Sequence, residues 1–197
     1  MDIAPYVDSL RRDLLAAAEA GGPEVAAAAE RLGYALEPAT RLALMEALSQ
    51  AAAEITALGG YPVIILAVLV VTGLLLITRR YGPAVYTVVS VASGAAVSQV
   101  LKSYFERPRP DIVDHLDVVH TASFPSGHAM MSAITYLTLG ILLARVEPRR
   151  RVRAFLLGLA VFLTVIIGVS RVYLGVHWPT DVLAGWTAGA AWALMWW

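Results

Sequence analysis

Five long stretches of the chain contain no Asp, Glu, Lys or Arg. They cover residues 55–78, 81–101, 118–144, 154–170 and 182–197. A helix needs about 17 to 25 mostly apolar residues to cross a bilayer. We therefore predict transmembrane helices over roughly 61–78, 82–102, 128–144, 154–170 and 181–197. A single stretch of this kind can also be a buried helix of a water-soluble core, but five of them in one small chain favour membrane spans.

Small residues recur at every fourth position in two of these helices. Ser90, Gly94 and Ser98 form one series, and Gly185 and Gly189 form another. Small side chains at this spacing let helix backbones approach closely in lipid. We interpret both series as helix-packing positions.

The N-terminal region has a different pattern. Residues 7–20 and 24–33 are rich in Ala, carry charges at helical spacing and are separated by Gly21-Gly22-Pro23. We predict short amphipathic helices here, in an acidic segment over residues 1–58 that precedes a membrane domain over 59–197. No basic stretch precedes an apolar core at the start, so we expect no signal peptide.

Composition agrees with an all-α integral membrane bundle. Hydrophobic residues make up 58% of the chain and charged residues only 15%, and there is no cysteine. Disulfides and thiolate metal sites are therefore excluded. The arginines lie scattered between apolar runs rather than on one face, so we expect no nucleic-acid partner.

Basic residues also set the orientation. Arg79 and Arg80 follow the first predicted helix, and five arginines lie within 145–153, between the third and fourth. The positive-inside rule places both connections in the cytoplasm. Loops 103–127 and 171–180 then lie together on the extracytoplasmic face of a multi-pass protein of the cell membrane. The N-terminus is also outside unless residues 42–58 cross, which Glu46 and Glu54 make unfavourable.

Three clusters in these outer loops carry the candidate chemistry. The first runs from Lys102 to Arg107-Pro108-Arg109-Pro110. Lys102 can simply extend to the membrane interface. The prolines stiffen the backbone between two guanidinium groups, however, and rigid cations suit an oxyanion ligand.

The second cluster is Pro125-Ser126-Gly127-His128, at the start of the third predicted helix. Unpaired amides and the positive dipole end of a helix form an anion site there. A histidine at a helix end is often structural, but one beside an anion site is a candidate for chemistry. The third cluster contains Arg171, His177 and Asp181. Asp181 can accept the N–H of His177 and leave the other ring nitrogen free to attack, whereas the alternative is an interfacial histidine beside Trp178.

Together, Lys102-x6-Arg109-Pro110, Pro125-Ser126-Gly127-His128 and Ser170-Arg171-x5-His177-x3-Asp181 resemble the three-part signature of the type 2 phosphatidic acid phosphatase (PAP2) superfamily. The resemblance covers roughly residues 55–197 and points to its membrane lipid phosphatases.

The resemblance implies a role for each site residue. His177 would be the nucleophile that forms a phosphohistidine, Asp181 its orienting partner and His128 the general acid. The phosphoryl oxygens would be bound by Lys102, Arg109, Ser126, Gly127 and Arg171. Such a site needs no metal or other cofactor, and its substrate would be a lipid phosphate or diphosphate, such as phosphatidic acid, phosphatidylglycerol phosphate or undecaprenyl diphosphate.

Two alternatives belong to other classes. One is a vanadate-dependent enzyme like the haloperoxidases that share the signature, although these are typically soluble and larger. The other is a non-catalytic fused or truncated membrane protein, since membrane relatives commonly have six helices and residues 1–58 replace the first one. A metal site in the 111–123 loop, from His115 and His120 with Asp111, Asp114 and Asp117, is a further alternative, and a solvated loop that covers the pocket is the simpler interpretation.

Overall fold

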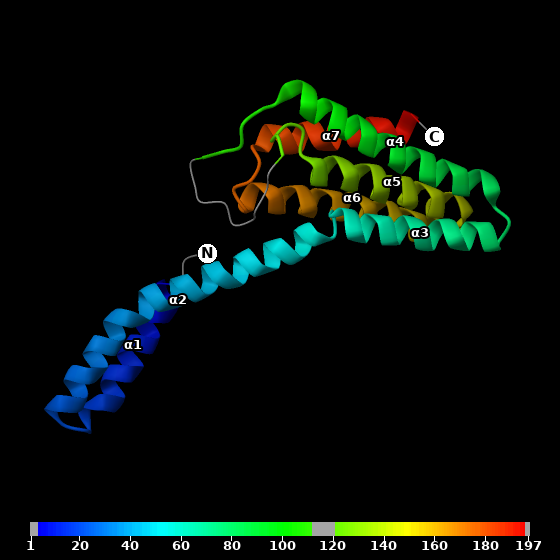
Figure 1. Cartoon of the computed structure of the whole chain (residues 1–197). Coiled ribbons are helices and arrows are strands. Elements are labelled where there is room, and N and C mark those ends of the chain that lie inside the picture. Colours follow the sequence, from blue (N-terminus) through cyan, green and yellow to red (C-terminus); the bar gives the residue numbers. More distant parts are fainter. Residues whose placement is uncertain (1–3, 112–120, 196–197) are drawn as a thin grey trace. The chain divides into compact units, whose positions relative to one another are not determined.

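The computed structural model describes residues 4–111 and 121–195, which form α-helices and their connections (Figure 1). The helices are α1 (Ala4–Glu19), α2 (Pro23–Ala57), α3 (Tyr61–Ile77), α4 (Tyr81–Phe105), α5 (Gly127–Val146), α6 (Arg150–Tyr173) and α7 (Pro179–Met195). These residues contain no strand, which confirms the all-α prediction. Helices α3 to α7 begin and end within a few residues of the five predicted membrane helices.

The chain divides into two compact units, Met1–Gln50 and Ala51–Trp197. In the first unit, Gly22 turns the chain between α1 and α2 with a φ of 86°, a conformation that glycine adopts at little cost. The guanidinium of Arg11 lies 4.3 Å from the ring centre of Tyr34. The prediction of short helices was wrong for α2, which has 35 residues and contains Pro38. The Ala- and Leu-rich sequence after residue 33 has high helix propensity and continues the helix. The boundary at residues 58 and 59 stays a prediction.

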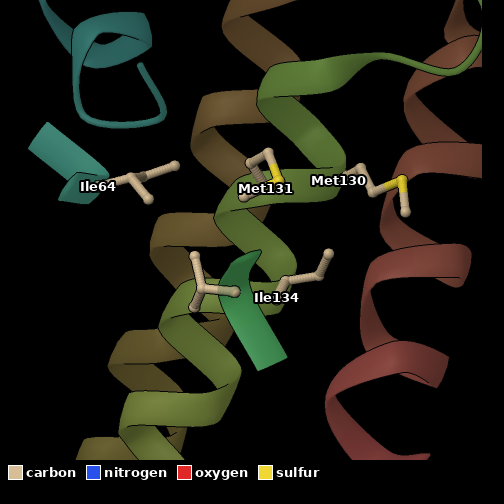
Figure 2. Close-up of a cluster of buried hydrophobic side chains, with 5 residues drawn as sticks. Ile64, Met130, Met131 and Ile134 are labelled. Carbon is tan, nitrogen blue, oxygen red and sulfur yellow. The ribbon is translucent and has the colours of Figure 1, made fainter. Parts of the chain in front are cut away.

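Helix α5 is central in the second unit, where it contacts α3, α4, α6 and α7. Its buried side chains Met130, Met131 and Ile134 form a core with Ile64 of α3 and Val91 of α4. Figure 2 shows these side chains entering the core from different helices, with Met130 extending from α5 toward α7. The contacts of α5 with α4, α6 and α7 hold the ends of these helices next to one another.

The small residues allow these close helix contacts, as predicted. A Cβ atom on Gly94 would lie 2.5 Å from Ile134 Cδ1, and one on Gly189 would lie 2.6 Å from the Met130 carbonyl oxygen. A Cβ atom on Gly185 would lie 2.9 Å from the Ser126 carbonyl oxygen. Helix α7 therefore packs directly against the first turn of α5.

Large apolar side chains cover the outer surface of the bundle. Leu74, Val100 and Phe162 are 60%, 67% and 58% exposed. Such a surface suits lipid and would be unfavourable in water. Within the described residues, four helical stretches are long and apolar enough to cross a membrane: one within Pro23–Ile77, and Tyr81–Phe105, Gly127–Val146 and Arg150–Tyr173. Helix α7, the fifth predicted span, is not one of these four stretches; it has 17 described residues.

Candidate active site

The first part of the site is the end of α4 and the two arginines, Arg107 and Arg109, that follow it. Glu106 adopts the left-handed conformation, with a φ of 42°, and its N–H donates to the Lys102 carbonyl. Pro108 and Pro110 cannot continue the helix, so the segment that carries Arg107 and Arg109 lies outside it. Lys102 therefore occupies the last turn of α4, and the arginines lie beyond it.

The start of α5 forms the second part of the site. Ser126 is the N-cap residue, and its side chain accepts a hydrogen bond from the Ala129 N–H at 3.5 Å. Gly127 and His128 are the first residues of the helix. The Ser126 N–H donates to the Asp181 carbonyl oxygen at 3.0 Å, which connects this turn to α7.

The connection between α6 and α7 forms the third part. Arg171 is in the last turn of α6 and is completely buried. Gly175 turns the chain with a φ of 74°, and His177 follows just before α7 begins at Pro179. Asp181 lies in the first turn of α7 with no exposed surface.

These three parts surround a cavity of about 120 Å³. Its lining contains six of the eight predicted site residues: Lys102, Arg109, Gly127, His128, Arg171 and His177. The other two lie behind the cavity wall. Ser126 is buried and caps α5 with its hydroxyl, and Asp181 is buried behind His177.

Three cationic side chains, Lys102, Arg109 and Arg171, line the cavity. Lys102 is 9% exposed, and its Nζ donates to the Ala122 carbonyl oxygen at 2.7 Å. The Arg109 guanidinium is held by the carbonyl oxygens of Val176 at 2.6 Å and Thr121 at 2.9 Å. With Arg171 and the positive end of α5, these groups form a preorganised site for an anion with several oxygens.

The two ring nitrogens of His177 face different partners. Nε2 lies 3.3 Å from Arg109 Nη1, on the cavity side. Nδ1 lies 3.6 Å from Asp181 Oδ2. Burial lowers the pKa of His177 to about 4, with contributions from the positive charges of Arg109, Arg171 and Lys102, although its interaction with Asp181 acts in the opposite direction. The imidazole is therefore neutral at pH 7. Because the Arg109 guanidinium can only donate, Nε2 carries the lone pair and the proton lies on Nδ1.

Two residues beside this site, Arg107 and Ser123, make contacts that the sequence does not indicate. Arg107 was grouped with Arg109 as an oxyanion ligand, but its Nη1 donates to Asp181 Oδ1 at 2.7 Å. Ser123 was not predicted, although it is fully buried and donates to Asp181 Oδ2. Neither contact could be found from the sequence, because each joins positions 58 to 74 residues apart.

The connection from α2 to α3 also contributes to the cavity. Gly59 and Tyr61 line it, and a Cβ atom on Gly59 would lie 2.5 Å from Ile167 Cγ2. The Tyr136 hydroxyl donates to the Leu58 carbonyl oxygen at 2.7 Å. Residues just before the first predicted membrane helix therefore complete one wall.

The alternative metal site falls mostly outside the described residues. His115, His120, Asp114 and Asp117 are not among them, and neither is most of the loop that was expected to cover the pocket. Over residues 4–111 and 121–195, no group of three or more His, Asp or Glu side chains is arranged to hold a metal ion.

Comparisons with known proteins agree with the signature. A sequence model of the PAP2 superfamily matches residues 83–197. Phosphatidylglycerophosphatase B of Bacillus subtilis is 40% identical over 96 residues, which are 47% of this chain and 46% of that protein. An undecaprenyl-diphosphatase of Sulfolobus acidocaldarius is 33% identical over 128 residues, which are 61% of this chain and 57% of that protein. The chain thus spans about half the length of the curated relatives it matches.

Two solved structures share the fold. One is the transmembrane PAP2 type phosphatidylglycerolphosphate phosphatase from Bacillus subtilis, with a TM-score of 0.71 and 24% identity. The match covers 100% of this chain and 94% of that chain. The other is LpxE of Aquifex aeolicus, with a TM-score of 0.58 and 25% identity over 76% of this chain and 84% of that chain. The apolar helices and these relatives together identify a multi-pass membrane protein.

Proposed function

The chain belongs to the PAP2 superfamily, and on this basis we propose that it is a membrane phosphatase that hydrolyses a lipid phosphate or diphosphate. The observation that carries the proposal is the position of His177. Its Nε2 faces a cavity lined by Lys102, Arg109 and Arg171, and its Nδ1 faces a buried carboxylate. A neutral imidazole held in this way is a nucleophile directed at a bound phosphoryl group.

The reaction proceeds in two steps. Nε2 of His177 attacks phosphorus, and the bond from phosphorus to the leaving oxygen breaks. Protonated His128 donates its proton to that oxygen, and the product is a phosphohistidine. In the second step, neutral His128 accepts a proton from water as the water oxygen attacks phosphorus. The P–N bond breaks, its electron pair returns to Nε2, and inorganic phosphate leaves.

The cations and the start of α5 stabilise the charge of the transferred phosphoryl group. Lys102, Arg109 and Arg171 line the cavity beside the Gly127 backbone. Fixed charges of this kind are usually the largest catalytic contribution in phosphoryl transfer. Because the protein supplies this positive charge itself, we propose that the reaction is independent of a metal ion.

An apolar groove beside the cavity favours a lipid substrate. The groove has a volume of about 270 Å³ and is lined by side chains of α3, α4 and α5, including Val68 and Ala95. Tyr61 and Met131 line both the groove and the cavity. A lipid whose phosphate occupied the cavity could therefore place a hydrocarbon chain in the groove. A water-soluble phosphate ester would gain nothing there.

The site lies at the end of the bundle opposite its arginine-rich connections. It is formed where α4 and α6 end and where α5 and α7 begin, whereas Arg79, Arg80 and Arg149 lie at the other ends of these helices. With those connections in the cytoplasm, the site opens on the extracytoplasmic face of the cell membrane.

Phosphate release tests this proposal directly. The full chain, purified in mild detergent, is assayed with phosphatidic acid and with undecaprenyl diphosphate in the presence of EDTA, beside His177→Ala. We expect release that survives EDTA and is absent from the variant. No release from either lipid by a folded, monodisperse wild-type protein would contradict the proposed activity, and release that needs an added metal would contradict its metal independence.

A further inference from the structure

Asp181 is a buried carboxylate whose charge partner lies outside the phosphate cavity. It has no exposed surface, and a buried charge is stable only when it is paired and hydrogen-bonded. Arg107 Nη1 donates to its Oδ1 at 2.7 Å and also to Thr180 Oγ1 at 2.8 Å. On the other oxygen, the Trp178 backbone N–H donates to Oδ2 at 3.0 Å. Arg107 therefore holds the carboxylate from the side that faces away from His177.

The link between Asp181 and His177 passes near a third side chain. The direct distance from Asp181 Oδ2 to His177 Nδ1 is 3.6 Å, too long for a good hydrogen bond. The Ser123 hydroxyl donates to Oδ2, and its Oγ lies 3.4 Å from His177 Nδ1. A hydroxyl that donates to the carboxylate can only accept from Nδ1. This arrangement favours the tautomer with hydrogen on Nδ1 and a lone pair on Nε2.

The backbone connects Arg107 and Ser123 to each other. The Ser123 N–H donates to the Arg107 carbonyl oxygen at 2.9 Å. The Arg107 guanidinium lies 5.5 Å from the ring centre of Trp178, whose Nε1 donates to the Pro108 carbonyl oxygen at 3.2 Å. The segment after α4 is thus fixed to the loop that precedes α5 and to the loop between α6 and α7, which carries His177. Small displacements of Arg107 would be transmitted to Asp181.

We propose that Arg107 and Ser123 are positioning residues that act through Asp181: Arg107 fixes and charge-balances the carboxylate, and Ser123 connects it to Nδ1 of His177. This inference rests on the proposed function of His177 as the nucleophile. It assigns to Arg107 a role different from that of Arg109, although the two side chains are separated by a single proline. Arg109 lines the phosphate cavity, whereas Arg107 donates to Asp181 on the side of the carboxylate away from His177.

A double-mutant cycle tests the role of Arg107. Because a slight misplacement of a reacting group can lower the rate by up to about 100-fold, we expect Arg107→Gln to lower kcat by about 10- to 100-fold. KM should change by less than about threefold, since Arg107 makes no contact with the cavity contents in this account. Arg107→Lys should recover part of the loss. In an Asp181→Asn background, Arg107→Gln should have little further effect, because its partner charge is already gone.

Controls separate this role from a general loss of structure. Arg151→Gln, on the exposed first turn of α6, should leave kcat unchanged. Arg109→Gln should instead raise KM. Additive losses in the Arg107 and Asp181 cycle, or a rise in KM alone for Arg107→Gln, would overturn the inference while leaving the phosphatase activity of the wild type intact.

The tautomer of His177 provides a readout that does not depend on activity. In ¹⁵N-labelled protein, the two imidazole nitrogens report which of them carries the proton. The Arg109 guanidinium beside Nε2 can only donate and also favours a proton on Nδ1, so the comparison is made in an Arg109→Gln background. There we expect the proton on Nδ1, and Ser123→Ala to shift the population toward Nε2. An unchanged tautomer in folded Ser123→Ala would overturn the role of Ser123. An inactive wild type with the expected tautomers would contradict the proposed function and not the positioning.

Discussion

His177 should remain mostly neutral at pH 5, where an ordinary histidine is mostly protonated. Its pKa is lowered to about 4, first by burial and then by Arg109, Arg171 and Lys102. A depressed pKa means that the imidazole gains its proton only as the pH falls through about 4. At pH 5 the neutral fraction should be about nine-tenths, against about 3% for a histidine with a pKa near 6.5, a difference of about 30-fold.

An NMR titration of the ligand-free protein measures this directly. The chain has four histidines, and His177→Gln assigns the signal. The phosphate-free enzyme is required, because the negative charge of a bound phosphate would raise the pKa of His177. Arg109→Gln should also raise this pKa, since it removes a nearby positive charge. A midpoint near 6.5 in the wild type would refute the account of a buried nucleophile surrounded by cations.

Three further changes test other parts of the structure. Gly189→Ala should destabilise the bundle by about 1–3 kcal/mol through overpacking, because its Cβ atom would lie 2.6 Å from the Met130 carbonyl oxygen. The measurement is thermal unfolding in detergent, and the control is Gly158→Ala, whose added Cβ would have no neighbouring atom within 4 Å. Equal losses of stability in the two variants would contradict the close packing at Gly189. Lys102→Met should raise KM and weaken inhibition by inorganic phosphate by about 10- to 100-fold, because it removes one charge-assisted hydrogen bond to phosphate. An unchanged inhibition constant would show that phosphate binds elsewhere. Ala95→Phe should raise KM for a long-chain lipid phosphate by about tenfold, through the loss of about two buried CH₂ groups at ~0.8 kcal/mol each, and leave a short-chain ester unaffected. Equal effects on both esters would argue against a chain in the groove.

The fold was largely predictable because membrane helices have a strong one-dimensional signal. Uncharged stretches of sufficient length located α3 to α7, and Gly185 and Gly189 marked a close helix contact before any neighbour was known. The length of α2 was missed: the predicted helix ended at residue 33, before Pro38 and the charged residues around it. The helix continues through them.

The candidate site was predictable only in part, because local motifs can be found in the sequence and contacts between distant segments cannot. The cluster at Pro125 to His128 is local, so a helix start and its anion site could be inferred from adjacent residues. The partners of a side chain across the bundle could not. Arg107 and Arg109 look equivalent along the chain, but the turn at Glu106 and the two prolines direct one to Asp181 and the other to the cavity. Ser123 carries no local signal of its contact with Asp181.

Trapping of the phosphoenzyme tests the central claim most directly. Wild-type protein is incubated with a lipid diphosphate labelled with ³²P at its terminal phosphate and is quenched in alkali, where a phosphohistidine is stable. The account predicts label on the peptide that contains His177, loss of that label in acid, and no label in His177→Ala. Rapid release of labelled phosphate by the wild type without a labelled peptide, or a label that persists in His177→Ala, would contradict a histidine nucleophile at this position.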